Sequence, residues 1–521
     1  MYEPHKVAYM TIRKAWIGFL FLVVSVCSAG QKPNLLFVFS DQQSRDMLGC
    51  YGNRDIKTPN LDRLAAEGIR FNHCVSSYPV CTPYRGMLLS GQHPLYCGTV
   101  ANDVPLLANN GRYLPHILRD AGYRMGYVGK WHLLGHDRKR PIPPGKMRYG
   151  FDGMFYSNNC HVDYRAGKCY YWDENDKQVF FDEWEVYGQT KQALDFLDGC
   201  SPDEPFALMV SWHPPHDWGM QSWEEFIYRY ETLPELMDLY DREKIALRPH
   251  VEDTPLVRQA YHGYYAMCSG VDIAFGRLMA KLKEKGLQDN TLVVFTSDHG
   301  DNLNSYNYKT PKSHPEDTAL RVPLLMRWPQ GLPQARTSEL LVGTLDLMPT
   351  LLGLLGHPIP PTVQGQDLSR AIRNGDDDVV DSVPLFYHGG PWFGVYTRDV
   401  TYARGQVRHW AHVEDAYRGR AMVPVRVLYD RSRDPHQLKN LYGLPETKDL
   451  QQRMEQLTQK WMARFGDPGL SVDQIRNLYQ IPRPKSAHSE EGDSLLMWPE
   501  DTLQPGFKGR PIDVIQARSE L

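Results

Sequence analysis

The chain has 521 residues, of which 42% are hydrophobic and 23% are charged, which is the composition of a folded protein long enough for two domains. Its formal net charge of -4 provides no basic footprint of the kind that nucleic-acid binding requires, so nucleic acid is not an expected partner.

The first thirty residues have the order of a secretory signal peptide. Arg13 and Lys14 precede an apolar run over residues 15–26, and small residues follow. The run is shorter than the roughly 20 residues that a spanning helix needs. The sequence therefore predicts a signal peptide over residues 1–30, export to the periplasm or the extracellular space, and no membrane span. Cys27 leaves lipid anchoring open, although the valine before it is bulkier than the small residue that such cleavage prefers.

Apolar runs alternate with helical patterns from residue 34 to about residue 380. Continuous apolar runs predict buried strands at residues 34–40, 123–128, 206–211, 291–297 and 322–328. Helical segments between them stop at glycines, as in the segment that begins after Thr58 and ends at Gly68. This alternation predicts an α/β domain over residues 31–380, with a mixed, mostly parallel sheet flanked by helices.

The pattern changes after residue 381. Shorter strand-like pieces follow, then a helix near residues 450–465 and a tail rich in proline, serine and charge. We expect a smaller C-terminal α+β domain with an antiparallel sheet, which together with the tail covers residues 381–521.

Ionisable or polar side chains follow four of the predicted strands. In chain order the four strands lead into Asp41 and Gln42, Lys130 and His132, His213 and His216, and Asp298 and His299. The carboxyl ends of parallel strands share one edge of a sheet, where open α/β folds place ligands, so these residues are expected to lie together. Asp41 and Asp298 supply hard oxygen ligands, which suit calcium or magnesium better than zinc.

The segment Cys81–Gly91 (CTPYRGMLLSG) resembles the signature of type I sulfatases, which reads CxPxR and, further on, Leu-Thr/Ser-Gly. Other segments match the family in order: GKWH at 129–132, PPH at 214–216, SDHG at 297–300, and Lys312 ahead of an RVP stretch. The chain is identified by this resemblance as a formylglycine-dependent sulfatase of the alkaline-phosphatase-like superfamily, over nearly its whole exported length.

The resemblance implies a modified nucleophile and a metal ion. In the family a formylglycine-generating or sulfatase-maturating enzyme, here an expected partner, oxidises the cysteine to formylglycine (3-oxoalanine), whose hydrate attacks sulfate monoesters. It further implies that Ca²⁺ is bound by Asp41, Gln42, the modified Cys81, Asp298 and His299. Gln42 departs from the second aspartate found in many members and leaves the site with one formal charge less.

The resemblance also implies a role for each catalytic residue. Arg85 would hydrogen-bond the hydrate, and Lys130 and Lys312 would bind sulfate oxygens. His216 would protonate the leaving alcohol, and His132 would remove a proton from the second hydroxyl and so expel sulfate.

The expected substrate is a sulfated small molecule or glycan, and export favours a sulfated carbohydrate. Two segments rich in sugar-contacting side chains, 212–223 and 387–398, supply the candidate substrate-binding residues His213, His388, Trp392 and Arg398. These aromatics could instead only fasten the two domains together, and His213 could be structural. Two other functions stay open: a phosphoesterase or phosphonate monoester hydrolase of the same superfamily, and a glycan-binding relative without catalysis.

Overall fold

The computed structural model describes Met1 and residues 31–108, 111–135, 138–173, 175–222, 227–308, 310–408, 422–471, 474–475, 510 and 512–513. The chain divides into two units, Met1–Gln31 and Lys32–Leu521, and every element below belongs to the second. Except for Met1, the predicted signal peptide lies outside the described residues, and so does most of the predicted C-terminal tail. None of the helices in the described part of the chain combines the length and apolar character that a membrane crossing requires.

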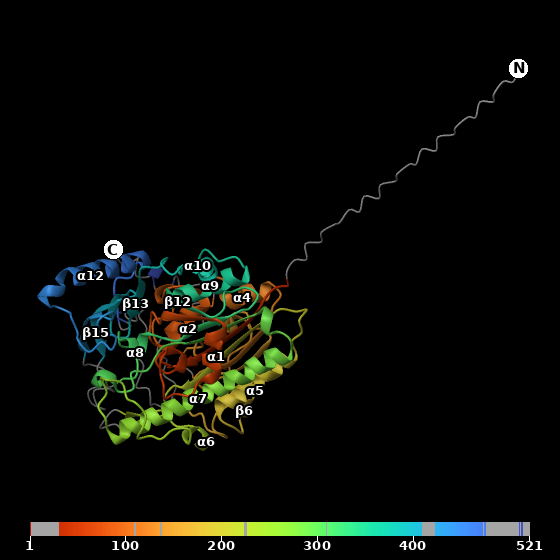
Figure 1. Ribbon diagram of the computed structural model, residues 1–521, viewed down its shortest axis with the longest axis horizontal. Coiled ribbons are helices and arrows are strands. Elements are labelled where there is room, and N and C mark those ends of the chain that lie inside the picture. Colours follow the sequence, from red (N-terminus) through yellow and green to blue (C-terminus); the bar gives the residue numbers. More distant parts are fainter. Residues whose placement is uncertain are drawn as a thin grey trace. The chain divides into compact units, whose positions relative to one another are not determined.

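A ten-stranded sheet forms the centre of the second unit (Figure 1). Its middle is β1 (Asn34–Asp41), which lies between β10 (Thr291–Ser297) and β7 (Phe206–Pro215), and β7 pairs in turn with β3 (Arg124–Lys130). All three pairings are parallel, so the four strands that precede the ionisable residues do end at one edge of the sheet.

The outer strands make the sheet mixed, as predicted. They are β2 (Ile69–Val75), β4 (Met154–Asn158), β5 (Tyr170–Trp172), β6 (Gln178–Phe180), β11 (Leu324–Arg327) and β12 (Arg336–Gly343). β11, one of the five strands predicted from the sequence, runs antiparallel to both of its neighbours, β10 and β2.

Alternate side chains of β1 enter two separate hydrophobic cores. Leu35, Phe37 and Phe39 join the core that contains residues of α2 (Cys81–Ser90), α4 (Leu114–Asp120) and α9 (Thr344–Leu355). Leu36 and Val38 join the core formed with α1 (Pro59–Glu67), α5 (Glu185–Asp198) and α7 (Pro255–Glu284). Each such side chain contributes about 1.5–3 kcal/mol on burial, so β1 is held firmly between the two helical layers.

The remaining elements of the large sheet region are short. The short helices are α3 (Pro94–Cys97), α6 (Pro234–Met237), α8 (Asp317–Leu320) and α10 (Ser369–Asn374). The 3₁₀ turns are η1 (Gly49–Tyr51), η2 (Lys146–Arg148), η3 (Gln288–Asn290) and η4 (Ser305–Asn307). A separate two-stranded sheet pairs β8 (Met220–Ser222) with β9 (Ile227–Tyr228).

A second sheet of four antiparallel strands follows in the C-terminal part of the chain. Its strands are β13 (Val383–Tyr387), β14 (Trp392–Tyr396), β15 (Val400–Arg408) and β16 (Met422–Asp430), paired in that order. After η5 (Pro445–Thr447), α12 (Lys448–Phe465) packs against this sheet. The predicted antiparallel sheet and helix are confirmed, and β14 lies within the segment 387–398 that was expected to supply substrate contacts.

Candidate active site

Cys81 is the first residue of α2, and it lies among the strand ends. Its Sγ atom is 3.6 Å from Asp41 Oδ1, 3.3 Å from His299 Nε2 and 3.4 Å from Lys312 Nζ. The N-cap residue of the helix, Val80, offers no side-chain cap, and a helix N-terminus favours negative charge. Burial opposes ionisation of the thiol, but the two lysines nearby, together with His299, hold the pKa of Cys81 well below its ordinary value.

Two buried carboxylates face the nucleophile position. Arg85 Nη2 lies 3.1 Å from Asp41 Oδ2 and 3.3 Å from Asp298 Oδ2, and Lys130 Nζ lies 2.6 Å from Asp41 Oδ2. Burial and the Cys81 thiol act to raise the pKa of Asp41, but Lys130 and Arg85 outweigh them and hold it well below its usual range. Burial and the Asp41 carboxylate raise the pKa of Asp298. A further cation beside Asp298 would stabilise the ionised form of this second carboxylate.

The residues present fit a calcium ion. Ligand atoms of Asp41, Cys81, Asp298 and His299 all lie within 4.8 Å of one another, and all four residues are buried. Gln42 Oε1 is also buried, and none of the described residues donates a hydrogen bond to it. Two carboxylates and an amide oxygen give the hard donor set that calcium prefers, with the imidazole beside them.

The amide of Gln42 is oriented by residues that the sequence did not reveal as part of the site. Its Nε2 donates to Asp301 Oδ2 at 2.8 Å and to Asp217 Oδ2 at 3.1 Å, which leaves Oε1 without a partner. The hydroxyl of Tyr230 donates to the same oxygen of Asp301 at 2.6 Å. Asp301 therefore helps to fix the direction in which the Gln42 amide points.

Lys312 and His216 also lie close to Cys81 and to each other. Lys312 Nζ is 2.9 Å from His216 Nε2, in addition to its contact with Cys81 Sγ. The other ring nitrogen of His216 donates to the carbonyl of Asp217 at 2.5 Å, which fixes the ring orientation. A cation and a proton-carrying ring are thus held together beside the nucleophile position.

His132 follows β3 and is fully buried beside Asp103. Its Nε2 lies 2.9 Å from Asp103 Oδ1. Arg138 donates to both oxygens of the same carboxylate, at 2.7 and 2.6 Å. Neither Asp103 nor Arg138 stood out in the sequence, because both lie in loops without apolar periodicity.

His213 joins the site, whereas the other predicted substrate contacts do not. The ring of His213 is fully buried, 5.2 Å from that of His216, and burial and Lys130 lower its pKa to about 3. A contact between His213 and substrate stays a prediction.

His388 and Trp392 are as fully buried as His213, each with 0% exposed surface, and their contact with substrate stays a prediction. The ring of His388 lies between Leu470 O and Asp467 Oδ2, and Trp392 Nε1 donates to Ser313 O at 3.0 Å. The alternative that these aromatics fasten the C-terminal sheet to the large sheet region also stays open. Arg398 pairs with the Asp378 carboxylate and lies 31% exposed.

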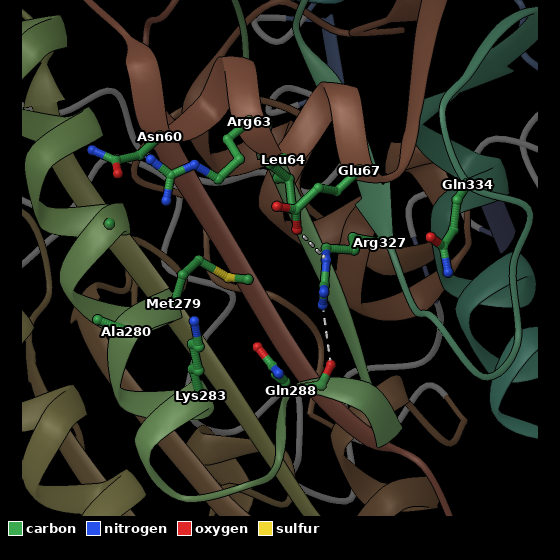
Figure 2. Close-up of a pocket in the computed structure, with 11 residues that line it drawn as sticks. Asn60, Arg63, Leu64, Glu67, Met279, Ala280, Lys283, Gln288, Arg327 and Gln334 are labelled. Atoms are coloured by element: carbon green, nitrogen blue, oxygen red, sulfur yellow. Dashed lines mark hydrogen bonds and ion pairs between the residues drawn. The ribbon is translucent and has the colours of Figure 1, made fainter.

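A separate cavity of about 400 Å³ contains none of the predicted site residues (Figure 2). It lies between α1, α7, η3 and the end of β11, where Arg327 binds the Glu67 carboxylate and the carbonyl of Gln288. Because its lining offers no nucleophile precursor and no converging ligand set, we assign the chemistry to the sheet edge.

A buried cysteine at a helix N-terminus, a cluster of buried groups that could hold a metal ion and several fixed cations together suit a hydrolase of anionic esters. A family model described as "Sulfatase" matches residues 33–357, and one described as "N-sulphoglucosamine sulphohydrolase, C-terminal" matches residues 312–463. The chain belongs to the sulfatase family and is a sulfuric ester hydrolase.

Named relatives and solved structures agree with this family. The chain is similar to an ulvan-active sulfatase of Formosa agariphila, at 32% identity over 86% of this chain and 84% of that one. It is similar to an endo-4-O-sulfatase of Bacteroides thetaiotaomicron, at 28% identity over 85% of this chain and 94% of the relative. The solved structure of the yidJ sulfatase of Bacteroides fragilis superposes with a TM-score of 0.72 at 30% identity, covering 84% of this chain and 97% of that one.

Proposed function

We propose that this protein hydrolyses sulfate monoesters carried by carbohydrates, with a formylglycine made from Cys81 as nucleophile and a bound calcium ion. The observation that supports the proposal best is the position of Cys81 Sγ, within 3.6 Å of Asp41, His299 and Lys312. The Sγ atom occupies the place that a hydroxyl of the formylglycine hydrate would take. Residue 81 therefore adjoins both the candidate cation ligands and Lys312, the residue proposed to bind a sulfate oxygen.

When present, the hydrate supplies an oxygen nucleophile and the calcium ion supplies positive charge for the sulfate oxygens. The protein's own residues hold this arrangement in place. Arg85 bridges the Asp41 and Asp298 carboxylates, and Lys130 contacts the same Asp41 oxygen as Arg85 does. These fixed charges do not have to reorganise when charge develops on the reacting ester.

Lys312 and His216 would act on the sulfate and on the leaving alcohol. Lys312 Nζ lies between Cys81 Sγ and His216 Nε2, so it can bind a sulfate oxygen beside residue 81. His216 presents Nε2 to the same space because its Nδ1 is engaged by the backbone. In this structure Nε2 accepts from Lys312, so the acid role requires that Nε2 take up a proton when Lys312 turns to the sulfate; that proton can then pass to the alkoxide that a sugar ester leaves behind.

The carbohydrate substrate class rests on the relatives and on the expected export. One relative is named as active on ulvan and another as an endo-4-O-sulfatase, and a third, at 24% identity, is named as an N-acetylglucosamine-6-O-sulfatase. We also propose that residues 1–30 direct export. N-terminal sequencing of protein recovered from the periplasm or medium would show whether they are removed, and an uncleaved N-terminus on protein retained in the cytoplasm would contradict export.

The proposal is tested on protein produced together with a formylglycine-generating enzyme. Mass spectrometry of the peptide that contains Cys81 is expected to show sulfur exchanged for oxygen with loss of two hydrogens. The same protein is then offered sulfated mono- and oligosaccharides, an aryl sulfate, a phosphodiester and a phosphonate monoester. We expect the highest kcat/KM on a sulfated saccharide. A preference for the phosphonate or the phosphodiester would favour the alternative hydrolase of the same superfamily.

A further inference from the structure

The histidine expected to act as a base has a fixed orientation. His132 Nε2 lies 2.9 Å from Asp103 Oδ1, and His132 is 2% exposed. Because a carboxylate only accepts hydrogen bonds, Nε2 must carry the proton of this contact. Burial opposes ionisation of Asp103, but Arg138 and His132 outweigh it and keep the pKa of the carboxyl well below its usual value.

The other ring nitrogen of His132 is not engaged by Asp103. Among the described residues Nδ1 is buried without an aligned hydrogen-bond partner, and the thiols of Cys81 and Cys160 both interact with the ring. Burial acts to lower the pKa of His132, but Cys160 and Asp103, together with Cys81, raise it to about 10. Because Nε2–H is held by Asp103, Nδ1 is the nitrogen that offers a lone pair once the charged ring has given up one proton. This is the arrangement that a base acting on residue 81 needs.

The backbone around this pair is strained. His132 has a φ of 56° and Asp103 a φ of 62°, a left-handed conformation that is unfavourable for a residue with a side chain. Thr82, the residue after Cys81, connects the two. Its hydroxyl donates to His132 O at 2.9 Å and accepts from the backbone N–H of Asp103 at 3.4 Å. The pair is therefore tied directly to the start of α2.

We propose that Asp103 is a positioning residue that holds His132 as the Nε2–H tautomer, so that Nδ1 is the atom that takes a proton from the modified residue 81. This inference rests on the proposed function. In the step, the O–H bond of residue 81 breaks and its electron pair stays on oxygen. The proton becomes the Nδ1–H of an imidazolium whose charge the Asp103 carboxylate balances. Arg138 acts on His132 through Asp103; it fixes the position of the Asp103 carboxylate by donating two hydrogen bonds to it.

The test replaces Asp103 without disturbing its backbone. Asp103→Gly removes the carboxylate, and glycine adopts a positive φ at no steric cost. Asp103→Asn keeps an oxygen acceptor but removes the charge. Protein with ¹⁵N-labelled histidine is titrated from the charged to the neutral ring, and the signals of His132 are assigned by comparison with His132→Gln. These spectra report the tautomer whether or not the protein turns over substrate.

We expect the neutral His132 ring of the wild type to be the Nε2–H tautomer, and the ring of Asp103→Gly to become a mixture. On an aryl sulfate, kcat of Asp103→Gly is expected to fall roughly 10²- to 10⁴-fold, the usual range for a general base, with KM changed far less. Asp103→Asn is expected to restore the tautomer, and part of kcat with it.

An unchanged tautomer in Asp103→Gly, or a kcat within a few-fold of wild type, overturns the inference. If Asp103→Gly does not fold, the Asp103→Asn protein decides, since a wild-type kcat without the carboxylate charge would contradict the role of Asp103 in balancing the imidazolium. Failure of the proposed function looks different: wild-type protein with formylglycine would release no sulfate, while the dependence of the His132 tautomer on Asp103 would remain.

Discussion

Replacing Arg85 with methionine should destabilise the protein strongly, although the two side chains have similar apolar stems. The guanidinium of Arg85 is 2% exposed, contacts both Asp41 and Asp298, and donates at 2.7 Å to the carbonyl of Lys130 and to the hydroxyl of Ser211. Without it, two buried carboxylates lose a shared cation, and a carbonyl and a hydroxyl lose a donor. Breaking a buried ion pair from one side costs about 3–5 kcal/mol, so we expect a loss of this size.

The assay is urea denaturation followed by tryptophan fluorescence, with calcium and with a chelator. Added calcium is expected to recover part of the loss, because it can neutralise the same carboxylates. Arg119→Met is the matched control: Arg119 also contacts two carboxylates, those of Asp120 and Asp152, but it is 39% exposed and should cost less than about 1 kcal/mol. Equal losses for the Arg85 and Arg119 variants would refute the view that Arg85 holds the acidic pair together.

Three further predictions concern function. Trp392→Phe removes the donor to the carbonyl of Ser313, beside Lys312, and should cost about 0.5–1.5 kcal/mol in stability and raise KM for a sulfate ester; an unchanged KM would show that this bond does not position Lys312. His216→Ala should slow sugar sulfates, which are esters of poor leaving groups, much more than aryl sulfates, as kcat/KM across a series of leaving groups would show; equal losses throughout the series would reject the acid role. Chelation should abolish sulfate release and lower the melting temperature, since the two carboxylates of the site then repel each other. Elemental analysis would show that the chelated protein contains no metal, and full activity of that protein would refute metal dependence.

The convergence of the site could be predicted from the sequence because it follows from sheet topology. Continuous apolar runs are recognisable as buried strands in the sequence. Because β1, β3, β7 and β10 pair in parallel, Asp41, Lys130 and Asp298 lie at the same edge of the sheet. The helix that begins at Cys81 could be placed for a similar reason, since the signature itself contains its first turns.

The support of the site could not be predicted in the same way. Asp103 contacts His132, and both residues adopt left-handed backbone conformations. Such conformations in loops leave no periodic pattern of apolar residues in the sequence, so they could not be predicted. His388 and Trp392 have aromatic character that suits sugar binding, but the packing around β14 leaves neither any exposed surface. Burial of this kind depends on contacts between distant parts of the chain, which a local segment does not reveal.

The most direct test of the account is the release of inorganic sulfate from a sulfated saccharide, measured by ion chromatography. Wild-type protein made together with a formylglycine-generating enzyme is compared with Cys81→Ala, and Cys200→Ala serves as a control for loss of another buried thiol. We predict that wild type and Cys200→Ala release sulfate and that Cys81→Ala releases none. Sulfate release by Cys81→Ala at the wild-type rate would contradict the central claim that residue 81 provides the nucleophile.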